Sequence, residues 1–314
     1  MLANIKKTFR PLLSILTAAQ AGEQMENNVF VAALLVSVIA LLGLFAEAVL
    51  LIPYVAVKSV MAGIEAAQTG NFQLNMNSVD MTLVQLFATV GATVAMMLYV
   101  KHVEKRSLRT MGFVREHAVS DYLIGMVVAF AMFAACVGIC MATGAMVFSG
   151  YVLGGRYLMM ALFFVGFIIQ GMSEETVCRG FMMTSLGSKG GALVGVLFNS
   201  VFFGLLHLNN SGMTVFSMVN LVLFGLFMSV LVLKLNSIWM ACAIHTVWNF
   251  VQGNFFGILV SGTDMGLSVF RFVSVPGMGL WNGGSFGMEG GLATCIVLTV
   301  ATVITLLIKP RESK

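Results

Sequence analysis

Long apolar runs separated by short polar segments make up most of the chain. A transmembrane helix needs roughly 20 apolar residues, and about eight segments approach or exceed that length. The segments are Val29–Ile52, Leu83–Val100, Tyr122–Phe148, Tyr157–Leu186, Ala192–Leu208, Val215–Leu233, Ile238–Val260 and Gly291–Ile308. The pattern predicts an all-α, polytopic transmembrane helix bundle of about eight spans, with helices four to seven as its core.

Two of the connecting segments are long, and both are expected on the outer side of the membrane. Lys58–Thr82 is polar and contains several asparagines, and Ser261–Gly290 is rich in glycine and aromatic residues. A flexible connector is the ordinary interpretation of such a segment, and a lid that admits substrate is the alternative. The sequence leaves both open.

The composition agrees with a membrane protein. Hydrophobic residues make up 59% of the chain, charged residues only 10%, and the mean hydropathy is +0.97. Soluble domains contain about 25% charged residues. The net charge of +4 could indicate nucleic-acid binding in a soluble protein, but here Lys and Arg lie between apolar runs. We therefore expect the lipid bilayer as a partner, and no nucleic acid.

The basic residues predict the orientation of the bundle. With the N-terminus inside, only Lys58, Arg156 and Arg271 lie on the outer side, and Arg179 lies within a span. The others then face the cytoplasm, as the positive-inside rule requires: Lys6, Lys7, Arg10, Lys101, Lys105, Arg106, Arg109, Arg115, Lys189, Lys234, Lys309, Arg311 and Lys314. We expect a multi-pass protein of the plasma membrane with both termini in the cytoplasm.

The same pattern divides the chain into four parts. Residues 1–28 form a cytoplasmic lead-in without a cleavable signal peptide, in which a short interfacial helix is one interpretation. Residues 29–156 contain helices one to three, 157–260 the core, and 261–314 the outer loop, the last helix and a short cytoplasmic tail.

The five cysteines lie within apolar stretches and lack the spacing of a zinc knuckle or a disulfide framework. We expect them to be small buried side chains: Cys136, Cys140, Cys178, Cys242 and Cys295.

Few ionisable side chains lie within the predicted spans, and such residues are costly in a bilayer and therefore mark functional sites. They are Glu47, Glu174, Glu175, Arg179, His207 and His245. All but Glu47 fall in helices four, five and seven. Glu47 lies near the outer end of helix one, where an interfacial carboxylate is expected.

Helix geometry brings these groups to one depth. The turn Gly187–Gly191 makes helices four and five an antiparallel hairpin, with Glu174 about 15 residues before it and His207 about 17 after it, or roughly 20–25 Å into the membrane. Asn249 lies about 18–20 Å into helix seven, one turn above His245 on the same face.

The two adjacent glutamates receive different roles. Arg179 follows Glu175 by one helical turn, and an unpaired arginine in lipid is costly, so Glu175 is its expected counter-ion. Glu174 is left without an obvious partner and is a candidate general base or acid.

Three motifs in this region resemble those of a known family. Glu174-Glu175-Thr-Val-Cys-Arg179 matches EExxxR, Phe203-Gly-Leu-Leu-His207 matches FxxxH, and His245-Thr-Val-Trp-Asn249 matches HxxxN. They occur in this order on separate apolar helices, and the chain resembles the CPBP or Abi family of CAAX-processing-like intramembrane proteases from about Tyr157 to Gly257. The segment Arg106–Gly112 is similar to the family's usual lead-in.

The resemblance implies that 157–260 is a catalytic core that hydrolyses peptide bonds within the membrane. Glu174 with His207 would activate water, and His245 with Asn249 would stabilise the oxyanion. Phe203 would pack and orient, while Glu175 and Arg179 would support the site. The implied substrate is a membrane-embedded or lipid-anchored peptide or protein.

The motif residues are compatible with two mechanisms, one without a cofactor and one with a zinc ion. The glutamate mechanism needs none and is favoured here. The alternative is a metalloprotease in which Glu174, His207 and His245 bind zinc as a His₂Glu set.

Three other functions are alternatives to a protease. A transporter or proton relay also uses intramembrane Glu and His, but it predicts charged helices in both halves of the chain. A haem protein with His207 and His245 as axial ligands leaves Glu174 and Asn249 unexplained. A non-enzymatic immunity or scaffold membrane protein is the last alternative, against which the intact motifs argue.

Overall fold

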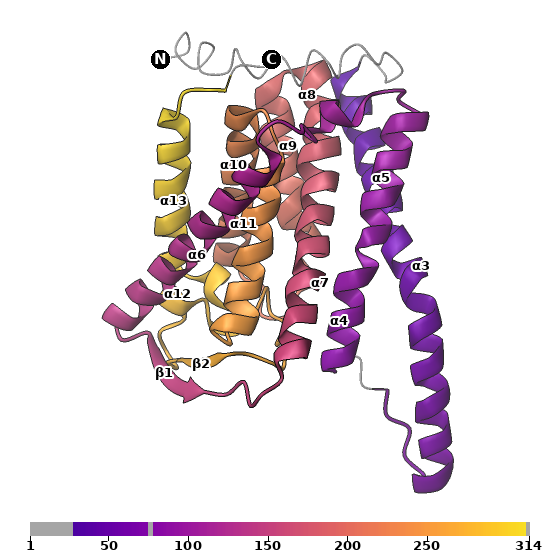
Figure 1. The fold of residues 1–314 in the computed structure, drawn as a ribbon, viewed down its shortest axis with the longest axis vertical. Coiled ribbons are helices and arrows are strands. Elements are labelled where there is room, and N and C mark those ends of the chain that lie inside the picture. The colour runs from indigo at the N-terminus through magenta and orange to yellow at the C-terminus, as the bar shows by residue number, and fades with distance from the viewer. Residues whose placement is uncertain (1–27, 75–77, 312–314) are drawn as a thin grey trace.

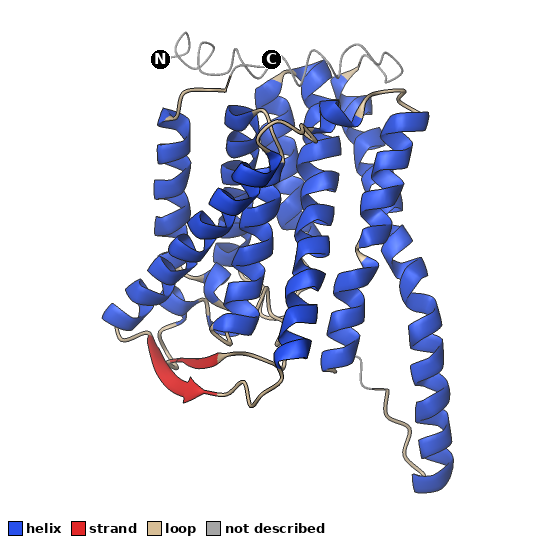
Figure 2. Cartoon of the chain, viewed as in Figure 1, coloured by secondary structure: helices blue, strands red, loops and turns tan. Residues whose placement is uncertain are grey.

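The computed structural model describes residues 28–74 and 78–311, which are almost entirely helical (Figure 2). In the described part of the chain, eight helical units cross the bundle in turn (Figure 1): α3 (Val29–Thr69), α4 with α5 (Val79–Ala88, Val90–His102), α6 (Ala118–Ala142), α7 with η3 and α8 (Tyr157–Glu175, Thr176–Met183, Thr184–Gly190), α9 (Ala192–Leu206), α10 (Val215–Leu235), α11 with η4 (Trp239–Phe250, Val251–Phe255) and α13 (Leu292–Leu307). The short helices η2 (Leu108–Met111), α12 (Gly279–Asn282), η5 (Gly284–Phe286) and η6 (Met288–Gly290) lie in the connections.

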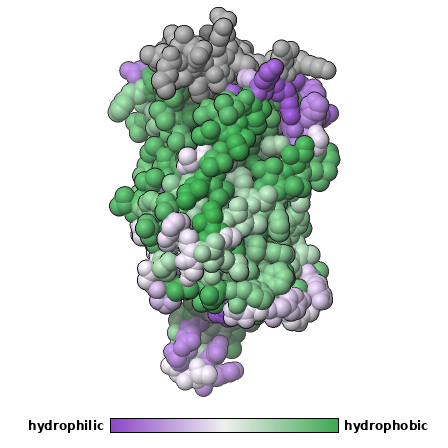
Figure 3. Space-filling view, turned by 90° about the vertical axis from the view of Figure 1, so that its left-hand side faces the viewer, coloured by the Kyte–Doolittle hydropathy of each residue, from purple (hydrophilic) through white to green (hydrophobic). Residues whose placement is uncertain are grey.

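The length and composition of these helices confirm the predicted all-α membrane bundle. Among residues 28–74 and 78–311, five helical segments are long and apolar enough to cross a membrane: Val29–Thr69, Val79–His102, Ala118–Ala142, Tyr157–Gly190 and Val215–Leu235. Ala192–Leu206 and Leu292–Leu307 are shorter apolar helices. A broad apolar surface covers the middle of the molecule, with hydrophilic groups towards its two ends (Figure 3). Side chains such as Leu158, 77% exposed, are therefore placed to face lipid.

Helix α3 is longer than predicted. The expected end at Ile52 is wrong, because the helix continues to Thr69 and spans about 60 Å at 1.5 Å per residue. Its far end projects beyond the bundle (Figure 1). The first half of the predicted outer segment Lys58–Thr82 is thus helical, and a salt bridge of 2.6 Å between Lys58 and Asp80 joins it to α4.

Helix α6 is shorter than predicted. It ends at Ala142 and not at Phe148, because a turn at Gly144, with φ of 73°, leads into strand β1 (Met146–Tyr151). This strand pairs antiparallel with β2 (Phe270–Ser274), which lies inside the second long segment, Ser261–Gly290. The second segment is therefore structured and anchored to the end of α6.

The described chain begins and ends at the same end of the bundle. Val29 lies beside Gly190 at the end of α8. Arg311 forms a bidentate ion pair with Asp121 near the start of α6, and its backbone N–H donates to Lys234 O at the end of α10. The predicted lead-in, residues 1–28, lies outside the described residues except for Asn28. The domain boundaries, the cytoplasmic placement of both ends and the plasma membrane stay predictions.

The cysteines follow the sequence interpretation. Cys136, Cys140, Cys178 and Cys242 are buried among apolar side chains, Cys295 is half-buried, and all five are free thiols.

Candidate active site

The EExxxR motif lies where α7 changes its helical form. Glu174 and Glu175 end the regular helix, and Arg179 lies in η3, a π-helical stretch. Such stretches are rare and frequently found at functional sites. Arg179 Nη1 lies 2.9 Å from Glu175 Oε1, and both side chains are fully buried. The predicted i,i+4 pair is therefore present.

His245, on α11, faces both glutamates. Its Nδ1 lies 2.8 Å from Glu175 Oε1, and its Nε2 lies 3.5 Å from Glu174 Oε2. The close approach of the two helices depends on Gly171, because a Cβ there would lie 2.8 Å from the backbone nitrogen of Thr246. The imidazole in direct reach of Glu174 is thus that of His245.

Gln170 links Glu174 to Asn249. It lies one turn before Glu174 on the same face of α7, and its Nε2 donates to Glu174 Oε1. Asn249 Nδ2 donates to Gln170 Oε1 over 3.1 Å. The sequence interpretation missed Gln170, although a polar residue four positions before a motif glutamate within an apolar run was a usable signal.

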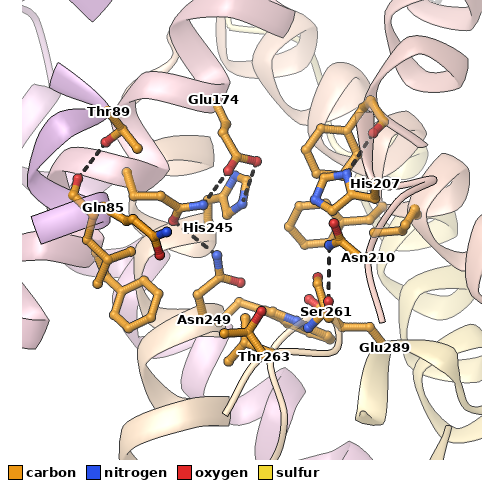
Figure 4. A pocket seen from close by; sticks show the side chains of 18 of the residues that line it. Gln85, Thr89, Glu174, His207, Asn210, His245, Asn249, Ser261, Thr263 and Glu289 are labelled. Carbon is orange, nitrogen blue, oxygen red and sulfur yellow. Dashed lines mark hydrogen bonds and ion pairs between the residues drawn. The ribbon is translucent and has the colours of Figure 1, made fainter. Parts of the chain in front are cut away.

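His207 lies across the cavity from Glu174 (Figure 4). It follows the last turn of α9, where its Nδ1 lies 2.8 Å from Phe203 O. A carbonyl oxygen can only accept a hydrogen bond, so Nδ1 is the donor. The other ring nitrogen, Nε2, takes no part in this hydrogen bond. No hydrogen bond or ion pair joins Glu174 to His207, and the two side chains line opposite sides of the same cavity.

Phe203 packs among the other motif residues. Its ring lies 4.8 Å from that of His207 and 5.9 Å from that of His245, centroid to centroid. The guanidinium carbon of Arg179 lies 4.9 Å from its centre, within the range of a cation–π contact. Phe203 thus packs against Arg179, His207 and His245 at once.

All four predicted catalytic residues line one cavity of about 400 Å³. Glu174, His207, His245 and Asn249 come from α7, the end of α9 and α11, as the depth estimate required. Figure 4 shows their polar ends turned towards the shared space. The predicted convergence of three helices is found in the structure.

The cavity also contains polar residues that the motifs do not include. Glu47 lines it from α3, a position that the interpretation of this residue as an interfacial carboxylate did not foresee. The first two helical units contribute to the cavity in this way, because α4 packs against α7 and α3 packs against α4. The further polar lining residues are Thr82, Gln85, Thr89, Gln170, Asn210, Asn220, Ser261, Thr263, Glu289 and Thr294.

The segment after η4 closes one side of this cavity. Ser261 and Thr263 line it, and Asn210 Nδ2 donates to Ser261 O over 3.0 Å (Figure 4). Glu289 Oε2 accepts from Ser261 N and Oγ over 2.8 and 2.6 Å. Of the two interpretations of Ser261–Gly290, the position over the cavity favours a cover over a free connector.

The alternative zinc set does not form a ligand cluster. Among residues 28–74 and 78–311, no group of three His, Cys, Asp or Glu side chains is arranged to hold a metal ion. His207 lies across the cavity from Glu174 and His245. Glu174, His207 and His245 are therefore not gathered around a shared ion in this arrangement.

Comparison with protein families finds a match within the chain. Residues 155–251 match the family described as type II CAAX prenyl endopeptidase Rce1-like. The matched segment contains all three motifs and ends two residues after Asn249. Comparison with curated proteins finds no match, and neither does comparison with solved structures.

Proposed function

We propose that the protein is an intramembrane endopeptidase acting on a membrane-embedded or lipid-anchored peptide or protein. The match of residues 155–251 to the Rce1-like type II CAAX prenyl endopeptidase family supports this proposal. The observation that carries the proposal is the meeting of Glu174, His207, His245 and Asn249 in one intramembrane cavity. The family match supports a protease of the CAAX type in general, and the roles of individual residues are our proposal.

Water activation is assigned to Glu174 and His207. A water molecule held between the two side chains would lose a proton to Glu174 as its oxygen forms a bond to the scissile carbonyl carbon. Glu174 would then pass this proton to the amide nitrogen as the C–N bond breaks. Gln170, which donates to Glu174 Oε1, positions the carboxylate for this transfer.

Oxyanion stabilisation is assigned to His245 and Asn249. Asn249 Nδ2 has two hydrogens, and only one of them is used by Gln170. For His245 to donate from Nε2 as well, the ring must be doubly protonated, because Nδ1 already faces the Glu175 carboxylate. A single donor of this kind contributes roughly 10²–10³-fold to kcat.

The test uses the purified protein in lipid nanodiscs with a library of fluorogenic membrane peptides. Glu174→Gln and His207→Ala are expected to lower kcat by about 10³-fold, in line with the loss of a general base. The control is Glu65→Gln, which makes the same change at an exposed glutamate of α3 outside the cavity. Unaltered cleavage by folded Glu174→Gln protein would refute the assignment.

A further inference from the structure

His207 lies at a point of the fold that its own helix does not fix. It follows the last residue of α9, one of the shorter apolar helices, and begins the loop that leads to α10. The hydrogen bond of its Nδ1 goes back to Phe203 O in the same helix. This bond sets the ring relative to α9, but it does not set α9 relative to Glu174 on α7. The distance between His207 and Glu174 therefore depends on what packs against the loop.

A tight backbone turn packs against that loop. Val260 and Thr263 exchange two backbone hydrogen bonds, 2.9 and 2.8 Å long, around Ser261 and Gly262. Gly262 touches the loop directly, because a Cβ there would lie 2.1 Å from Ser211 O. No side chain fits between the two backbones at this point.

Asn210 joins the loop to the same turn. Its side-chain Nδ2 donates to Ser261 O, and its backbone N–H donates to His207 O, each over 3.0 Å. Further along the loop, a Cβ at Gly212 would lie 2.5 Å from the backbone carbonyl carbon of Ser285. The loop and the segment over the cavity thus meet backbone to backbone, and a shift of the turn must move the loop that carries His207.

Ser261 has a backbone conformation that serine rarely adopts. Its φ is 44°, and Gly262 follows with φ of 87°. Positive φ at both central residues is the pattern of a type I′ turn, in which asparagine and glycine are preferred. A residue in this region stays there only where its surroundings fix it. Glu289 does so, because its Oε2 accepts from both Ser261 N and Ser261 Oγ, over 2.8 and 2.6 Å.

Glu289 is itself fixed to the bundle. The residue is 9% exposed and lies in η6. Asn220 of α10 donates from Nδ2 to Glu289 O and Gly291 O, over 2.8 and 2.9 Å. A continuous connection therefore runs from α10 through Glu289 and the turn to the loop of His207.

We propose that Glu289 is a positioning residue for His207, acting through Ser261 and Asn210. The turn at the start of Ser261–Gly290 then serves as a fixed wall of the active site. The proposal rests on the proposed function, and it adds a residue that lies outside the family match at residues 155–251. Glu289 acts here as an acceptor for one backbone N–H and one hydroxyl group, so a neutral acceptor of the same length should replace it.

The environment of the His207 ring can be measured without any cleavage. The chain has four histidines, so ring ¹⁵N spectra of the full-length protein in nanodiscs contain few signals, and those lost in His207→Ala identify this residue. Glu289→Ala and Asn210→Ala should each shift or split the His207 signals, because the loop loses its fixed contact. The matched control is Asn209→Ala, which changes the exposed neighbouring asparagine outside the cavity and should leave them in place.

Kinetics test whether this position matters for cleavage. Glu289→Ala and Asn210→Ala should each lower kcat by about 10²-fold, a loss that a small misplacement of a catalytic group can cause, with KM changed by less than about twofold. Glu289→Gln keeps an acceptor oxygen and should retain kcat to within about fivefold. In a His207→Ala background, Glu289→Ala should have little further effect. The control Asp264→Asn changes an exposed carboxylate of the same segment and should match wild type.

The outcomes distinguish the two proposals. The positioning role is overturned if the His207 signals stay in place in Glu289→Ala and Asn210→Ala, if kcat is unchanged in these variants, or if Glu289→Gln is as slow as Glu289→Ala. Asn210→Ala changes only a loop side chain, so the test remains valid if Glu289→Ala fails to fold. If the signals shift as expected and wild-type protein cleaves no peptide, the connection from Glu289 to His207 stands and the endopeptidase proposal fails.

Discussion

Glu175 Oε1 lies 2.8 Å from His245 Nδ1, and this contact joins the C-terminal end of α7 to α11. The same oxygen lies 2.9 Å from Arg179 Nη1. Glu175 thus neutralises a buried guanidinium and also orients the ring whose second nitrogen faces Glu174. The sequence interpretation assigned only the first of these two tasks.

Replacement of Glu175 should therefore destabilise the protein. Glu175→Gln leaves Arg179 fully buried without a countercharge, and breaking a buried ion pair from one side costs about 3–5 kcal/mol. We expect a lower midpoint of thermal unfolding in detergent and a lower yield of inserted protein. Glu65→Gln is the control, and an unchanged midpoint for Glu175→Gln would contradict the role.

Removal of both partners should be milder than removal of one. In Glu175→Gln with Arg179→Met, no unpaired charge remains in the buried site, so part of the stability lost in Glu175→Gln should return. A double-mutant cycle on the unfolding midpoints measures the coupling. Strict additivity of the two single changes would show that the ion pair contributes nothing.

Gln170 should act as a positioning residue for the catalytic pair. Gln170→Ala removes the contacts to both Glu174 and Asn249, and small misplacements of catalytic groups cost up to about 10²-fold in rate. We expect a fall in kcat with little change in KM. Because both residues act on one network, the effect of Asn249→Ala should be smaller in the Gln170→Ala background than in wild type. If Gln170→Ala and Asn249→Ala lower kcat independently of each other, Gln170 does not couple Asn249 to Glu174.

Gly171 should tolerate no side chain. Gly171→Ala places a Cβ 2.8 Å from Thr246 N, which forces α7 and α11 apart, and overpacking of this kind costs about 1–3 kcal/mol. The midpoint of thermal unfolding and the rate of cleavage should both fall. The matched control is Gly138→Ala in α6, where a Cβ meets no atom within 4 Å. This control should be neutral or slightly stabilising, since alanine favours a helix.

Metal removal tests the mechanism directly. If Glu174 and His207 activate water without an ion, cleavage should persist after exhaustive treatment with 1,10-phenanthroline, and metal analysis of active protein should show less than about 0.1 zinc per chain. Loss of activity that returns on addition of zinc would instead favour the His₂Glu alternative.

The class of fold and the identity of the motif residues were accessible from the sequence, because the bilayer imposes simple rules. Apolar length defines a span, and charge within a span is too costly to occur without a purpose. These rules predicted the helical bundle and the depth of Glu174, His207, His245 and Asn249. They also paired Glu175 with Arg179, since that contact depends only on the local helix.

The tertiary structure decided which side chains face one another. No local rule states that His245 turns to both glutamates, that His207 lies across the cavity, or that Glu47 and Glu289 enter it from α3 and η6. Those relationships depend on the rotation of each helix and on the path of Ser261–Gly290 over the bundle. Packing between distant segments sets both, and hydropathy and sequence spacing do not contain that information.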